Sequence, residues 1–129
     1  MLQIGIKGKQ EISVEEKMSA RAIKSGELEV FATPAMIAFV ENTALESVKE
    51  YLEEGTGTVG TKVNISHIAA TPVGMKVTCE TELVEIDRRR LKFSVVVYDE
   101  KEKIAEGEHE RFVIDCAKFM EKANAKAGL

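Results

Sequence analysis

The chain has 129 residues, of which 44% are hydrophobic and 31% charged, and its formal net charge is −4. This size and composition are typical of a soluble globular protein, so we expect a single domain over residues 1–129. The acidic balance argues against a nucleic-acid-binding face, and no apolar run approaches the ~20 residues that span a bilayer.

The first third of the chain predicts a strand, a loop and a long helix. Weak alternation over residues 11–20 predicts the strand, and the polar stretch 21–29 predicts the loop. Thr33 and Pro34 predict the start of the helix, because threonine can cap free N–H groups and proline is favoured in the first turn. The helix should run to Glu53 or Glu54 and end at Gly55. Its first half is apolar on all sides, so other elements must surround it.

The remaining residues supply the surrounding elements. A change of alternation at Leu83–Val84 predicts a β-bulge, and consecutive tight turns predict an antiparallel meander. The whole pattern predicts an α+β hot-dog fold, in which a curled antiparallel sheet wraps around one long central helix. The expected strands cover residues 58–68, 75–86, 91–98 and 104–114, and a helical tail covers 116–126.

The first residues and the cysteines indicate a compartment. Residues 1–8 alternate charge and glycine and lack the apolar core of a signal peptide. Cys79 and Cys116 do not have the spacing of a metal site. We therefore expect two free thiols in a cytoplasmic protein.

Glu41 is a carboxylate in an apolar helix. Its neighbours three and four residues away are Ile37, Ala38, Ala44 and Leu45, so it should face the interior or a cleft. Burial of a lone carboxylate is costly. Glu41 is therefore either a structural partner of a buried cation or a general base.

His67 and Thr33 raise the same alternatives. His67 has the parity of Val63 and Ile65 and should face the interior, either as a hydrogen-bonded core histidine or as a site residue. Thr33 either caps the helix or contacts a substrate. It precedes Glu41 by eight residues, about 12 Å along a helix. A shared site therefore needs a bridging residue or a second copy of the chain.

Three further stretches leave their roles open. The glycines of residues 55–61 allow either a plain loop or a close approach of backbone N–H groups to a ligand. Arg88–Arg90 form either a solvated turn or a contact for a cofactor phosphate. His109 and Arg111 share one face with Gly107, either inward as a small slot with a cation or outward as polar surface.

Three segments in consistent order carry a family pattern: EVFATPAMIAFVENTA, GTVGTKVNISHIAATPVGMKVT and GEHERFVI. From Val30 to Ile114 they resemble the fluoroacetyl-CoA thioesterase-like branch of the hot-dog thioesterases. This resemblance implies a catalytic group of Thr33, Glu41 and His67. It also implies contacts to the acyl-CoA near Gly60 and Arg111, homodimers with sites at the subunit interface, and no metal.

The resemblance also implies a function. We expect a thioesterase that hydrolyses a short-chain acyl-CoA to an acid and free CoA, with no cofactor beyond the CoA of its substrate and with Phe31 beside the acyl group. The assembly should be a homodimer, with a tetramer as the alternative. The alternatives are a non-catalytic acyl-CoA-binding domain and a hot-dog dehydratase acting on hydroxyacyl thioesters. The family's aromatic lid is absent from residues 21–29, so we expect an open, mobile segment and weak preference for fluoroacetyl-CoA.

Overall fold

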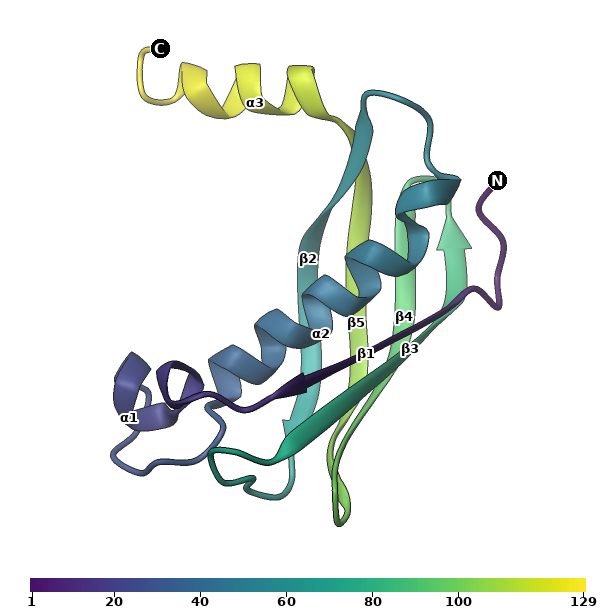
Figure 1. The fold of residues 1–129 in the computed structure, drawn as a ribbon. Coiled ribbons are helices and arrows are strands. Elements are labelled where there is room, and N and C mark those ends of the chain that lie inside the picture. Colours follow the sequence, from purple (N-terminus) through teal and green to yellow (C-terminus); the bar gives the residue numbers. More distant parts are fainter.

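The computed structural model describes all of residues 1–129, and its centre is a long helix held against a curled sheet (Figure 1). The five antiparallel strands have the order β1-β3-β4-β5-β2. The α+β hot-dog arrangement expected from the sequence is confirmed. The elements are β1 (Lys7–Ser13), α1 (Ala20–Ile23), α2 (Thr33–Val48), β2 (Thr56–His67), β3 (Lys76–Asp87), β4 (Arg90–Asp99), β5 (Lys103–Asp115) and α3 (Cys116–Ala125), with short 3-10 turns at Glu16–Met18 and Lys49–Tyr51.

Helix α2 packs on the sheet through one face. Its buried residues recur at helical spacing, and they are Met36, Phe39, Val40, Thr43, Ala44 and Val48. The expectation that its first half is covered on all sides is wrong for the single chain, because Ala38 is exposed and Ile37 is half-buried. The helix also ends earlier than predicted. A 3-10 turn replaces its last residues, and the chain is extended from Leu52.

The sheet buries the inner face of its three central strands. Leu91, Phe93, Val95 and Val97 of β4 are all buried, as their alternation predicts. The register between β3 and β4 shifts between Leu83 and Glu85, which confirms the predicted bulge. The expected four-strand meander is only partly correct. Strands β3, β4 and β5 follow one another, but β2 pairs with β5 and lies at the far edge.

Strand β2 contains a second register shift, between Gly60 and Lys62. A bulge reverses the side on which later residues point. Val59 therefore does not share a face with Val63 and Ile65 as expected, and Thr58 is the buried residue before the shift. Val63 is 39% exposed because β2 has no neighbour on its outer side.

The segment between β1 and α2 is more ordered than the sequence indicates. Strand β1 begins and ends earlier than expected, and helix α1 occupies part of the predicted loop. Ser19 causes this difference, because its hydroxyl accepts a hydrogen bond from the Ala22 N–H and caps α1. Lys24, at φ 63°, then ends the helix in a left-handed conformation.

Helix α3 lies at the periphery of the fold. It extends away from the sheet, and all its residues are exposed (Figure 1).

The two cysteines are free thiols, as expected: Cys79 is buried, Cys116 is exposed, and neither forms a disulfide. None of the helices combines the length and the apolar character needed to cross a membrane.

Candidate active site

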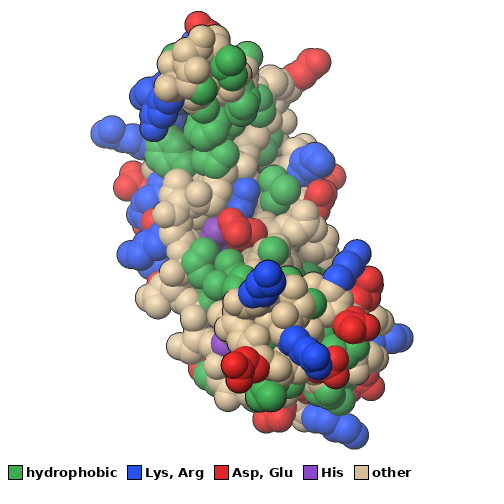
Figure 2. Space-filling model, turned by 90° about the vertical axis from the view of Figure 1, so that its left-hand side faces the viewer, with side chains coloured by type: hydrophobic (Ala, Val, Ile, Leu, Met, Phe, Trp, Pro, Cys, Tyr) green, Lys and Arg blue, Asp and Glu red, His purple; other side chains and the backbone are tan.

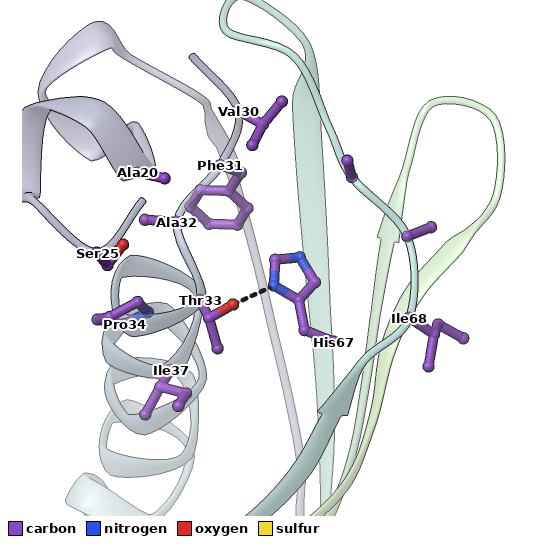
Figure 3. Close-up of a pocket in the computed structure, with 12 residues that line it drawn as sticks. Ala20, Ser25, Val30, Phe31, Ala32, Thr33, Pro34, Ile37, His67 and Ile68 are labelled. Atoms are coloured by element: carbon purple, nitrogen blue, oxygen red, sulfur yellow. Dashed lines mark hydrogen bonds between the residues drawn. The ribbon is translucent and has the colours of Figure 1, made fainter. Parts of the chain in front are cut away.

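Thr33 and His67 form a hydrogen-bonded pair. Thr33 is the first residue of α2 and His67 the last residue of β2, and Thr33 Oγ1 lies 2.8 Å from His67 Nδ1 (Figure 3). The prediction that Thr33 caps the helix is wrong. Ala32 occupies the cap position without a side-chain hydrogen bond. Because Thr33 is already helical, its side chain points across to β2 and its hydroxyl is available to the histidine.

An open pocket of about 740 Å³ lies beside this pair. Phe31, which the sequence analysis assigns to the substrate, is 1% exposed and belongs both to the core and to the pocket wall. Figure 3 shows its ring next to the imidazole of His67. His67 Nε2 is buried and has no hydrogen-bond partner. Burial lowers the pKa of His67, so the ring is neutral near pH 7 and can exchange a proton with a ligand.

Glu41 lies in a second cluster, further along α2. Its carboxylate Oε2 is 3.8 Å from Arg111 Nη1, and the two side chains are 41% and 6% exposed. Glu41 is therefore only partly buried in the single chain, and it faces a buried cation. His109 and Arg111 both point inward, which settles the orientation that the sequence left open.

Gly60 makes the approach of Glu41 possible. A Cβ atom at this position would collide with the Glu41 carboxylate, and it would lie 3.3 Å from His109 Cε1 and 3.4 Å from Arg111 Nη1. Gly60 directly precedes the bulge in β2. The predicted link between Gly60 and the site thus has a steric basis, since any side chain there would occupy the space of the carboxylate.

The six predicted site residues thus form two groups in one chain. Phe31, Thr33 and His67 lie around the pocket, whereas Glu41 of α2 meets Gly60 of β2 and Arg111 of β5. No hydrogen bond or ion pair joins Glu41 to Thr33 or His67. Two residues anchor Arg111, namely His109 and Thr58. The sequence places His109 on one face with Arg111 without assigning it a role, and it gives no signal for Thr58.

The remaining open stretches have simpler roles. Arg88 and Arg89 form the two-residue turn between β3 and β4, and Arg90 pairs with Glu85, Asp87 and Glu110. No group of three or more His, Cys, Asp or Glu side chains is placed to hold a metal ion.

Figure 2 shows histidine, acidic and basic side chains among hydrophobic ones on one face of the molecule.

Comparison with solved structures places the fold among the hot-dog proteins. A hot-dog-like protein from Thermanaerovibrio acidaminovorans superposes with a TM-score of 0.87 at 21% identity, over 97% of this chain and 93% of that one. The fluoroacetyl-CoA thioesterase FlK superposes with a TM-score of 0.93 at 32% identity, over 98% of both chains.

The sequence identifies the family within this fold. Residues 14–117 match the family described as fluoroacetyl-CoA-specific thioesterase. The fluoroacetyl-CoA thioesterase of Streptantibioticus cattleyicolor is 41% identical over 98 residues, which cover 76% of this chain and 70% of that protein. The chain therefore belongs to the fluoroacetyl-CoA-specific thioesterase family. This membership confirms the resemblance that the sequence analysis reported. It also confirms the enzyme class, which is acyl-CoA thioesterase.

His67, which is half-buried, and His109, which is buried, predict a loss of stability at mildly acidic pH. Burial lowers the pKa of His67 and of His109, and the charge of Arg111 lowers the pKa of His109 further. The unfolded chain therefore takes up protons first, from about pH 6.5 downward. We expect the free energy of unfolding to be constant above this pH. As the pH is lowered from the histidine pKa of the unfolded chain to the lower pKa of the folded chain, the free energy of unfolding should decrease.

Urea unfolding between pH 5.5 and 7.5 measures this dependence, and the double variant His67→Gln/His109→Gln should flatten it. Carboxylates titrate mainly below this range. A stability that holds or rises on acidification to pH 5.5 would contradict the prediction.

Proposed function

We propose that the protein hydrolyses short-chain acyl-CoA thioesters with Thr33, Glu41 and His67 as its catalytic residues. The observation that carries the proposal is the hydrogen bond between Thr33 and His67 beside a pocket, with the second nitrogen of His67 left unpartnered. A mutant of FlK, 33% identical with a TM-score of 0.87 over 92% of this chain and 99% of that one, is described in complex with fluoroacetate and CoA. That complex supports a CoA thioester as the substrate.

The reaction places distinct demands on the three residues. Water adds to the thioester carbonyl, the carbon–sulfur bond breaks, and the products are a carboxylic acid and CoA. Glu41 either removes a proton from the attacking water or attacks the carbonyl itself, in which case water then hydrolyses the resulting anhydride. The neutral ring of His67 accepts the proton that the water loses and passes it to the leaving sulfur. Thr33 holds the imidazole through its 2.8 Å hydrogen bond and orients the attacking group or the acyl chain.

The assigned binding residues surround the thioester in this proposal. Phe31 forms the wall against the acyl group, since it lines the pocket beside His67. Backbone N–H groups near Gly60 hold the CoA or the developing oxyanion, where one well-placed donor typically contributes ~3–4 kcal/mol. Arg111 lines the same region. The reaction uses no metal and no cofactor apart from the CoA of the substrate.

We further propose that the active unit is a homodimer with its sites between the subunits. Three features of the single chain support this arrangement: the exposed face of α2 at Ala38, the unpaired outer edge of β2, and the separation of Glu41 from His67. An exposed edge strand favours pairing with another chain. A tetramer would be a pair of such dimers. Two free thiols support a cytoplasmic location.

Replacement of Glu41 tests its catalytic role. Glu41→Gln should fold normally and lose at least ~10²-fold in turnover, the usual scale for loss of a general base. Glu46→Gln, the same change on the exposed side of α2, is the matched control and should leave turnover unchanged. If Glu41 only paired with Arg111, Glu41→Gln would instead lower stability and keep the activity of the folded fraction.

Subunit mixing tests the shared site. Glu41→Gln and His67→Ala should each be inactive alone, and light scattering should find dimers at micromolar concentration. If Glu41 of one subunit works with His67 of the other, a co-refolded equimolar mixture contains heterodimers with one intact site. About a quarter of wild-type activity should then return, because half of the dimers carry one of two sites. An inactive mixture that contains heterodimers, or an active wild-type monomer, would contradict the shared site.

Steady-state rates on acetyl-, propionyl- and fluoroacetyl-CoA test the substrate range. Discrimination between such similar acyl groups needs a closely fitted pocket. Residues 21–29 contain no aromatic side chain and are all exposed, so the pocket is open on that side. We expect turnover of all three thioesters and a fluoroacetyl preference in kcat/KM below ~10³, which corresponds to ~4 kcal/mol. A larger preference would contradict this expectation. Binding without turnover, or turnover only of a hydroxyacyl thioester, would overturn the proposed hydrolysis.

A further inference from the structure

His109 is a fully buried histidine that the proposed mechanism does not use. It is 0% exposed in the middle of β5, and its ring lies 6.4 Å from that of Phe93, centre to centre, at an angle of 28°. Both of its nitrogens have partners. Nδ1 is 2.8 Å from the carbonyl oxygen of Lys62, and Nε2 is 3.1 Å from Arg111 Nη1.

These two partners fix the protonation state of the ring. The Lys62 carbonyl can only accept a hydrogen bond, so Nδ1 must carry the proton. The guanidinium of Arg111 can only donate, so Nε2 must be the acceptor. His109 is therefore neutral and protonated on Nδ1. The imidazolium form would direct an N–H group at the N–H group of Arg111.

One of these partners lies beside the bulge in β2. The register with β5 shifts between Gly60 and Lys62. Lys62 directly follows the shift, and its carbonyl oxygen accepts the hydrogen bond from His109. The same irregularity brings Gly60, which has no side chain, opposite Arg111 and next to the Glu41 carboxylate.

Arg111 is held by His109 and by Thr58. Its Nε donates to Thr58 Oγ1 at 2.8 Å and its Nη2 to the Thr58 carbonyl oxygen at 2.9 Å. Its Nη1 donates to His109. The same nitrogen lies 3.8 Å from Glu41 Oε2. A planar guanidinium fixed on three sides can present its remaining Nη1–H in only one direction.

We propose that His109 is a positioning residue, whose neutral ring holds the Arg111 guanidinium so that it fixes the Glu41 carboxylate in the site. The proposal rests on the catalytic role of Glu41 proposed above. Small displacements of a reacting group carry large effects, since about 1 Å can cost ~10²-fold in rate. The prediction for His109 is therefore a loss in kcat, with substrate binding retained.

Two variants and a control separate positioning from plain stability. His109→Leu removes the acceptor for Arg111, whereas His109→Gln retains an amide oxygen that can accept from it. We expect His109→Leu to lower kcat by ~10- to 100-fold with KM changed less than about threefold, and His109→Gln to recover most of the loss. Val77→Ala, a buried position of β3 that pairs with Ile12 and Asp99 and lies outside the Phe93–His109 pair, should lower the melting temperature and leave kcat of the folded protein unchanged.

A double variant tests whether His109 acts through Glu41. Because positioning has no effect once the carboxylate is gone, Glu41→Gln/His109→Leu should be no slower than Glu41→Gln alone. Multiplying losses would overturn the proposal. So would a raised KM with unchanged kcat in His109→Leu, or a loss in kcat that His109→Gln does not relieve.

A readout independent of turnover keeps this proposal distinct from the proposed function. Nitrogen-15 NMR of the wild-type protein at pH 7 should show His109 protonated on Nδ1 alone, and the Arg111 side-chain signals should shift in His109→Leu. A proton on Nε2, or unchanged Arg111 signals, would overturn the inference. Should Glu41→Gln instead prove fully active, the catalytic assignment would fail, and these signals would still report whether His109 holds Arg111.

Discussion

Helix α2 must both pack against the sheet and carry two of the proposed catalytic residues, and the rest of the structure depends on this constraint. One face buries Met36, Phe39, Val40, Ala44 and Val48 against the curled sheet. A fully buried side chain of the larger kinds contributes about 1.5–3 kcal/mol, so this face provides much of the force that closes the fold. The side of the helix that faces β2 and β5 must present Thr33 and Glu41, whereas the face at Ala38 has no covering layer.

The proposed catalytic residues lie in two separate groups within the single chain. Thr33 at the start of α2 meets His67 at the end of β2, whereas Glu41, two turns further on, meets Gly60 and Arg111. A rigid helix keeps these groups apart, and no loop in the chain lies between them to bridge the distance. A second subunit that packs on the exposed face of α2 can bring Glu41 of one chain to His67 of the other. The proposed function therefore requires the dimer for catalysis.

The polar groups beneath the helix follow a second rule, that a buried charge needs fixed partners. Arg111 is 5% exposed as a residue and would be costly without acceptors. Thr58 and His109 supply them, and Glu41 supplies the opposing charge. His109 in turn donates to the carbonyl of Lys62, which directly follows the bulge. A backbone irregularity in β2 is thus connected through two side chains to the carboxylate.

The sequence by itself determined the elements with strong periodicity and the residues with unusual chemistry. Alternation in β4, the phase change at Leu83 and the polar residues at positions 33, 41 and 67 are all visible in the chain, because local spacing sets which side chains share a face. Only the tertiary structure decided that β2 pairs with β5, and that Thr33 turns to His67 instead of capping α2. It also decided that Arg111 faces Glu41. These outcomes depend on contacts between residues far apart in the chain, and local propensity carries no information about them.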